Sequence, residues 1–251
     1  MLEILFNLDY SSLVLIVVSF FTAIISATLS MAGGTILLSF MSMTMPIATL
    51  IPVHGAIQLV SNFWRCFLLR SEIKKDWFSA FCIGSVAGTV VATYFIQRIF
   101  NLEYSSIFIA MMIFYTLFKP KKMPKIKVST WGFSFVGFII GFGSMFLGAT
   151  GLILGLFFAD SGEKKNTIVA TQASMQTFNH ALKVLGYLYL GFSFLPWITL
   201  MILMMVSTIL GTSYGVKLLA KVPEEIFLRI YKSILFISAL KLVWDFIKLL
   251  L

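Results

Sequence analysis

The fold is decided by the stretch Ala32-Gly33-Gly34-Thr35-Ile36-Leu37, because a close copy, Ala149-Thr150-Gly151-Leu152-Ile153-Leu154, occurs in the second half of the chain. Gly34 and Gly151 lie 117 positions apart. A second pair of stretches repeats as well, since residues 53–58 match residues 171–176 at a spacing of 118. Two sequence-related halves are therefore expected: a first transmembrane repeat at 1–118, a basic cytoplasmic linker at 119–130 and a second repeat at 131–251.

Composition predicts an all-α polytopic membrane protein. Hydrophobic residues make up 59% of the 251 residues and charged residues only 12%, and helices satisfy their own backbone hydrogen bonds in lipid. The apolar runs predict segments at 11–30, 33–51, 53–69, 77–95, 104–118, 131–147, 151–159, 166–190, 195–219 and 226–251. Residues 151–159 are too few to cross a bilayer at 1.5 Å per residue. We therefore expect interrupted or re-entrant half-helices there, and eight to ten membrane segments in total.

The charges of equivalent loops predict that the two repeats are inverted. The loop at 70–76 carries Arg70, Lys74 and Lys75, whereas its counterpart, Gly191-Phe192-Ser193-Phe194, carries no charge. Because Lys and Arg concentrate in cytoplasmic loops, the two loops are expected on opposite sides of the membrane. Pairs of interrupted helices in inverted repeats commonly form a transport site.

The duplicated glycine clusters are the first candidate site. Each cluster ends one apolar run and begins another, with a threonine close by: Gly33, Gly34 and Thr35 in the first half, Thr150 and Gly151 in the second. A helix that starts in mid-membrane presents free N–H groups and a positive dipole end, which favour anions. The alternative is close helix packing, for which membrane proteins also use glycine. Because the same glycine-containing interruption occurs at equivalent positions in both halves, we favour the anion site.

A polar face on each of two expected helices is the second candidate site. Gln58, Asn62 and Arg65 are spaced so that they share one helix face. The equivalent face in the second half carries Gln176, Asn179, His180 and Lys183. Each face offers amides and a cation, which can bind an oxyanion by charge-assisted hydrogen bonds. The alternative is that Arg65 extends to the membrane surface and that the amides bond neighbouring helices.

The acidic residues exclude several functions. All ten carboxylates lie in loops or near segment ends, so none indicates the intramembrane Asp or Glu typical of cation or proton pathways. A small anion is the remaining substrate class. Nucleic acid is not an expected partner despite the net charge of +9, because the cations lie in short loops between spans.

Enzyme motifs are weak in this sequence. Gly211-Thr212-Ser213-Tyr214-Gly215 matches the G-x-S-x-G pattern, but that motif requires a strand-turn-helix elbow and an Asp/His pair. No metal-ligand spacing and no nucleotide-binding or other cofactor motif is present, so we expect no cofactor. Two ladders of small residues, one at 80–92 and one at 207–215, indicate packing seams. These seams would lie within one protomer or between the protomers of a homodimer.

Over its whole length the sequence resembles the TauE/SafE family of sulfite exporters. The resemblance is carried by the duplicated glycine interruption, by the apolar half-helix and polar helix that follow it, and by the basic central linker. This resemblance implies a bacterial-type inner-membrane transporter that exports sulfite, organosulfonates or related small sulfur anions.

We therefore expect a secondary transporter of a small oxyanion, such as sulfite, thiosulfate or an organosulfonate, that works by alternating access between two repeats. The glycine clusters would hold the oxygens, the amides and His180 would bond them, and Arg65 and Lys183 would supply charge. An anion channel of similar architecture is the alternative. A membrane-embedded enzyme that uses Ser213 is the third hypothesis.

Overall fold

The computed structural model describes residues 9–29, 33–98, 104–118, 127–158, 161–218, 240, 243, 244, 247 and 248, and every regular element within them is a helix. The elements are α2 (Tyr10–Leu29), α3 (Gly33–Ser42), α4 (Ile47–Leu68), η1 (Arg70–Glu72), α5 (Lys75–Arg98), α6 (Ser105–Phe118), α7 (Gly132–Leu147), α8 (Gly151–Leu156), α9 (Lys165–Tyr189), η3 (Leu195–Trp197) and α10 (Ile198–Leu218). The predicted all-helical class is confirmed for these residues.

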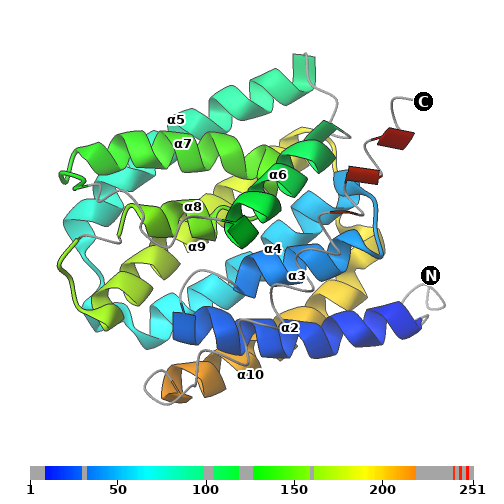
Figure 1. The fold of residues 1–251 in the computed structure, drawn as a ribbon, viewed down its shortest axis with the longest axis horizontal. Coiled ribbons are helices and arrows are strands. Elements are labelled where there is room, and N and C mark those ends of the chain that lie inside the picture. The colour runs from blue at the N-terminus through cyan, green and yellow to red at the C-terminus, as the bar shows by residue number, and fades with distance from the viewer. Residues whose placement is uncertain are drawn as a thin grey trace.

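Helices of the two halves pair with each other in three layers (Figure 1). Helix α5 of the first half packs along α7 of the second, and α2 packs along α10. Between these outer pairs lie α4 and α9, which pack against each other. Each half therefore contributes one helix to each outer pair and one to the centre, so the site in the middle depends on both halves.

Glycines allow the outer pairs to approach closely. A Cβ atom on Gly84 of α5 would lie 1.7 Å from the Ser134 carbonyl oxygen of α7, and one on Gly211 of α10 would lie 2.3 Å from the Phe20 carbonyl oxygen of α2. Small residues at helix interfaces let backbones pack at this distance in membrane proteins. The two ladders predicted from sequence are thus packing seams within one protomer.

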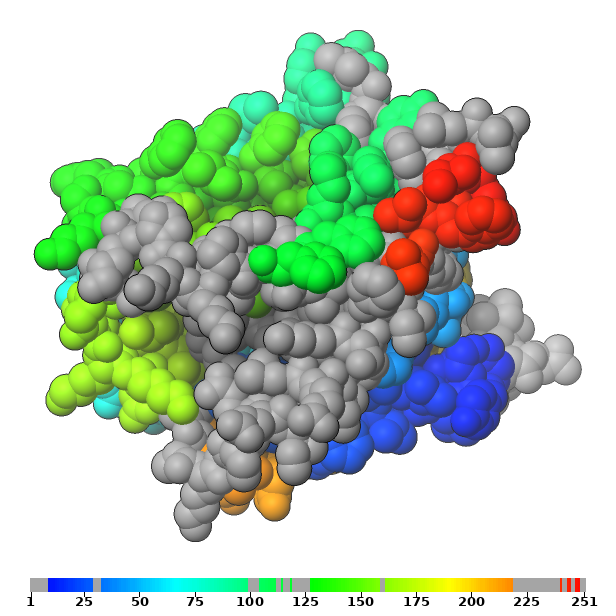
Figure 2. Space-filling view, viewed as in Figure 1, coloured from blue at the N-terminus to red at the C-terminus, as the bar shows by residue number. Residues whose placement is uncertain are grey.

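Apolar side chains project outward from the long outer helices. On α2 the exposed residues Leu13, Val17 and Phe21 follow one another at intervals of four, which places them on one helix face. Similar stripes occur on α5 and α10, with members Val86, Val90, Tyr94, Ile202, Val206 and Leu210. Figure 2 shows the side chains of α2 and α7 at the surface of one face of the molecule. Exposed stripes of this kind suit contact with lipid rather than with water.

Among the described residues, three helical stretches are long and apolar enough to cross a membrane. They are Tyr10–Thr28, Lys75–Arg98 and Leu195–Leu218. The comparably long helices α4 and α9 pack between the outer pairs and carry many buried polar side chains. The outer helices thus face lipid and the inner ones carry polar chemistry.

The interrupted segments of both halves form short helices. At 1.5 Å per residue, the ten residues of α3 and the six residues of α8 span about 15 and 9 Å, far less than a bilayer core. Helix α7 ends before Gly148, whose φ of 72° suits glycine in particular. This residue separates α7 from α8 as the sequence predicted.

The predicted boundary between the second and third segments was wrong. The sequence suggested a break near Pro52, but α3 ends at Ser42 and α4 starts at Ile47, directly after Pro46, so that Pro52 lies inside α4. Pro46 suits a helix start because its extended backbone directly precedes the first turn. Pro52 removes one helical N–H donor, a loss that membrane helices tolerate when neighbouring groups satisfy the freed carbonyl.

Several predicted features lie outside the described residues. These are most of the linker (119–126 of the expected 119–130), Met31 and Ala32 beside the first glycine pair, and all but five residues of the expected last segment at 226–251.

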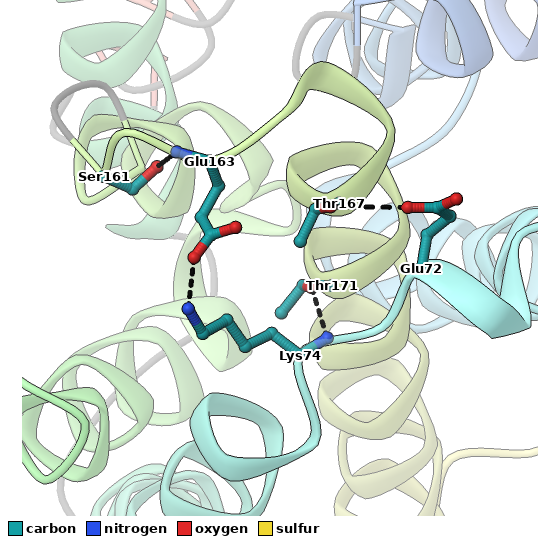
Figure 3. A network of polar contacts seen from close by, with 6 residues as sticks. All are labelled: Glu72, Lys74, Ser161, Glu163, Thr167 and Thr171. Atoms are coloured by element: carbon teal, nitrogen blue, oxygen red, sulfur yellow. Dashed lines mark hydrogen bonds and ion pairs between the residues drawn. The ribbon is translucent and has the colours of Figure 1, made fainter.

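A polar network joins the loop before α5 to the start of α9 (Figure 3). The Lys74 backbone N–H donates to the Thr171 hydroxyl at 2.9 Å, and the Lys74 ammonium pairs with Glu163. The Thr167 hydroxyl donates to Glu72 at 3.5 Å. The C-terminal end of α4 is therefore close to the N-terminal end of α9, and these central helices run antiparallel.

Candidate functional site

The central helices meet around a small cavity. Where α4 crosses α9, the rings of His54 and His180 stand edge to face with centroids 6.2 Å apart. The cavity is small, with a volume of about 30 Å³, which is about the space of one or two water molecules. It is lined by Ser26, Gly34, Thr35, His54, Gln58, Asn62, Arg65, Ala149, Thr150, Gly151, Gln176 and His180. These residues come from α2, α3, α4 and α9 and from the segment around the start of α8.

The two glycines at the start of α3 have different surroundings. A Cβ on Gly33 would lie 2.0 Å from the Thr22 carbonyl oxygen of α2, so Gly33 is a packing residue. A Cβ on Gly34 would meet the Gln58 side chain at 3.5 Å, an ordinary contact distance. Only Gly34 lines the cavity.

Equivalent side chains of α4 and α9 hold the two glycine segments in place. The His54 Nε2–H donates to the Gly34 carbonyl oxygen at 2.8 Å, and the Gln172 amide donates to the Gly151 carbonyl oxygen at 2.9 Å. His54 and Gln172 occupy matching positions of the duplicated stretches. The same carbonyl is thus bound in both halves by different side chains.

Arg65 brings a buried positive charge to the cavity. Its side chain comes from the last turn of α4 and is 2% exposed. The Nε and Nη2 atoms have no hydrogen-bond partner in the protein. The interpretation in which Arg65 extends to the membrane surface does not fit this burial. A buried guanidinium with free donors is costly unless an anion or water satisfies it.

Other lining residues also carry polar atoms without protein partners. The hydroxyls of Thr35 and Thr150 and both amide atoms of Gln176 are buried and unbonded. Asn62 is already engaged, since its Nδ2 donates to the Gln58 carbonyl oxygen at 2.8 Å and to Gln58 Oε1 at 3.3 Å. Most buried polar groups in proteins have a partner, so this concentration of unbonded groups indicates a place for a polar ligand or water.

Three predicted site residues do not line the cavity. Lys183, the sequence equivalent of Arg65, is fully buried and donates from its ammonium to the Gly148 carbonyl oxygen at 2.5 Å. Asn179 accepts hydrogen bonds at 3.3 Å from the hydroxyls of Ser85 and Ser144, which joins α9 to α5 and α7. Gly33 packs on α2, as described above. The other nine predicted residues line the cavity.

Sequence reasoning did not place Ser26, His54 and Ala149 in the site. The position of His54, four residues before Gln58 and so on the same helix face, could have indicated it. Ala149 belongs to the duplicated motif itself. Ser26 on α2 has no repeat partner or motif, so its sequence carries no signal for the cavity.

The site is suited to a small oxyanion. Its lining offers guanidinium, hydroxyl and amide donors and contains no carboxylate. Within the described residues, no group of three His, Cys, Asp or Glu side chains could hold a metal ion. Arginine donors arranged around a small space favour oxyanions over cations or neutral molecules.

A family model described as "Sulfite exporter TauE/SafE" matches residues 15–242. No curated protein and no solved structure matches the chain.

Proposed function

Because the chain belongs to the TauE/SafE sulfite exporter family, which is a family of membrane transporters and not of enzymes, we propose that it exports sulfite or a closely related small sulfur oxyanion through the α4–α9 cavity. The single observation that carries the proposal is the Arg65 guanidinium, buried at the cavity with two unbonded nitrogen atoms. A bound oxyanion would satisfy these nitrogens and the unbonded Thr35 and Thr150 hydroxyls that line the same cavity.

The small size of the cavity favours the smallest candidates. Sulfite has four heavy atoms, whereas organosulfonates add a carbon chain. Thiosulfate lies between the two in size. We therefore place sulfite first among the substrates.

Alternating access between two inverted repeats is the proposed mechanism. Equivalent helices α4 and α9 run antiparallel at the centre, as an axis in the membrane plane requires. The outer pairs follow the same symmetry, because each of the pairs α2–α10 and α5–α7 joins one helix of the first half to one helix of the second. Motion of one outer pair relative to the other would open the cavity to each side in turn, with eight to ten segments in the plasma membrane.

The site residues have distinct proposed roles. Arg65 supplies charge, while Gln58, Asn62, Gln176, Thr35 and Thr150 orient the oxygens. Gly34 and Gly151 leave space for the anion beside the backbone. His180 borders the same space, and Lys183 and Asn179 hold α9 against its neighbours.

Proteoliposome transport tests this proposal. Vesicles loaded with sulfite should show saturable counterflow of labelled sulfite with the wild-type chain. The variant Lys75→Gln, which changes an exposed residue outside the cavity, is the matched control and should transport normally. Ohmic anion currents in planar bilayers without counterflow would instead favour the channel.

Cysteine labelling tests the inverted repeats. Ser71 and Phe192 lie beyond opposite ends of α9, whose 25 residues span about 37 Å. A cysteine at Ser71 should therefore label from the cytoplasm and one at Phe192 from outside, with Lys122 cytoplasmic. Labelling of Ser71 and Phe192 from the same side would rule out the inverted arrangement.

A further inference from the structure

We propose that His54 is a proton-binding site, so that this protein binds its oxyanion together with a proton. The inference rests on the proposed function, because it concerns what happens when an anion occupies the same cavity. It starts from the hydrogen bond of the His54 ring to the Gly34 carbonyl oxygen, 2.8 Å from Nε2.

That bond fixes the tautomer of the ring. A carbonyl oxygen can only accept, so Nε2 carries the hydrogen and, in the neutral ring, Nδ1 carries a lone pair. Nδ1 is buried and has no partner in the protein. His54 is 0% exposed and lines the cavity. The neutral ring therefore has a free acceptor, and no further donor, to offer an anion in this cavity.

Proton uptake removes this conflict. A proton from solution forms an N–H bond with the lone pair on Nδ1, and the resulting imidazolium donates through both nitrogens. It then bonds the Gly34 carbonyl oxygen through Nε2 and can bond the anion through Nδ1. When the anion leaves, the N–H bond breaks, its electron pair stays on Nδ1 and the proton returns to solution.

Without the anion, the neighbouring charges oppose protonation. The elements packed against α4 are α3, α7, α9 and α10, of which α3 and α7 carry no ionisable side chain. The other ionisable groups on these helices are Arg65 and Cys66 on α4 itself, Lys165, His180, Lys183, Tyr187 and Tyr189 on α9, and the exposed Tyr214 and Lys217 on α10. None is a carboxylate. Among these described helices no side chain supplies the negative charge that favours an imidazolium, whereas a bound anion does, so the two binding events are linked.

The second half of the chain provides a matched variant. Gln172, at the position equivalent to His54, makes the equivalent bond to the Gly151 carbonyl oxygen at 2.9 Å, and its Oε1 is likewise buried and unbonded. Glutamine thus fits this structural position but cannot take up a proton in the physiological range. His54→Gln should keep the bond to Gly34 and the fold while removing the proton site.

The test is the affinity for sulfite as a function of pH in wild type, His54→Gln and His180→Gln, measured on the purified full chain. Sulfite itself titrates near neutral pH, but this titration is the same in all three experiments. A difference in pH dependence between the three proteins is therefore due to the protein. Between the pH at which the free wild-type protein takes up this proton and the higher pH at which its sulfite complex releases it, wild-type affinity should fall by about tenfold more per pH unit than that of His54→Gln, the slope for one linked proton. The two affinities should converge at high pH, and His180→Gln should follow the wild-type slope.

Other results of this experiment would refute either the role of His54 or the proposed function. Equal slopes in wild type and His54→Gln, or a slope lost only in His180→Gln, would refute the assignment to His54. Absence of saturable sulfite binding to wild type at every pH would refute the proposed function itself. Should His54→Gln fail to fold, proton uptake by the wild-type protein on sulfite addition, read with a pH dye against sulfite alone, decides the matter. No uptake beyond that of sulfite would refute the proposal.

Discussion

Arg65 and Lys183 occupy equivalent positions in the two halves of the chain, yet their surroundings differ. The Arg65 guanidinium lines the cavity with two nitrogens unbonded, whereas the Lys183 ammonium is bound to the Gly148 carbonyl oxygen at the end of α7. A cation near a helix C-terminus stabilises the negative end of the helix dipole. The duplication has thus produced one cation available to a ligand and one committed to the fold.

The difference indicates that the two halves, although related in sequence, contribute different chemical groups to this site. The central helices still cross at His54 and His180, and both glycine segments are still bound through one carbonyl each. In the proposed mechanism, however, the charge and the proton that accompany the anion are held by Arg65 and His54 on α4 of the first half. We therefore expect substitutions in the first half to affect anion binding and their equivalents in the second half to affect stability.

The largest expected effect is that of Arg65→Ala on transport. Loss of a charge-assisted hydrogen bond to the anion costs about 1.5–3 kcal/mol, which corresponds to a decrease in affinity of about 10- to 150-fold. Expression and thermal stability should change little, because the guanidinium has two donors without protein partners. Counterflow at several sulfite concentrations measures the effect. Wild-type transport by this variant would mean that the cavity is not the anion site.

The paired glycines allow a second comparison. Gly33→Ala should lower stability by about 1–3 kcal/mol, because its Cβ would overlap the Thr22 carbonyl oxygen at 2.0 Å. Gly34→Ala should fold, while Gly34→Val should fold but lose sulfite binding, since its stiff branched side chain would displace Gln58 and fill the cavity. Thermal denaturation with and without sulfite separates these outcomes. A full sulfite-induced shift in Gly34→Val would contradict the proposed role of Gly34.

Lys183→Met tests whether Lys183, unlike Arg65, contributes to stability rather than to anion binding. Methionine keeps the apolar contact of the lysine chain with Gly55 but leaves the Gly148 carbonyl oxygen without its donor. An unsatisfied buried acceptor costs about 1–3 kcal/mol, so the melting temperature should fall. Sulfite affinity should fall much less than in Arg65→Ala. A loss of affinity as large as that of Arg65→Ala with an unchanged melting temperature would mean that Lys183 binds the anion.

The smallest expected effect is that of the loop network. Lys74 and Glu163 form a partly exposed ion pair, with side chains 33% and 26% exposed, and pairs of this kind contribute at most about 1 kcal/mol. Glu163→Gln should therefore change the melting temperature only slightly and leave sulfite affinity unchanged. A large loss of affinity would show that the loop before α5 communicates with the cavity.

Much of the helical framework could be predicted from the sequence because it follows from apolar run length. The predicted 166–190 and 77–95 correspond to α9 (Lys165–Tyr189) and α5 (Lys75–Arg98) within a few residues. The break near Pro52 was misplaced because a proline signals disruption without saying whether a helix starts beside it or continues through it. Here Pro46 precedes a helix start.

The site was predictable where helical periodicity decides the geometry. Gln58, Asn62 and Arg65 line one cavity, as their spacing on one helix face required. Periodicity could not show that Lys183 reaches the end of α7, because that contact depends on tertiary packing and on the reach of a flexible side chain. Nor could it separate Gly33 from Gly34, since adjacent helical residues point about 100° apart and their neighbours come from other helices.

The most direct test of the central claim, that the α4–α9 cavity holds an oxyanion, is a crystal structure of the chain with selenite. Selenite has the shape and charge of sulfite and can be located by its anomalous scattering. The account predicts an anomalous peak in the cavity, within hydrogen-bond distance of the Arg65 guanidinium and the Thr35 or Thr150 hydroxyl, and no such peak in Arg65→Ala. A peak at Lys183 or elsewhere in the membrane region, with the cavity empty, would contradict the account.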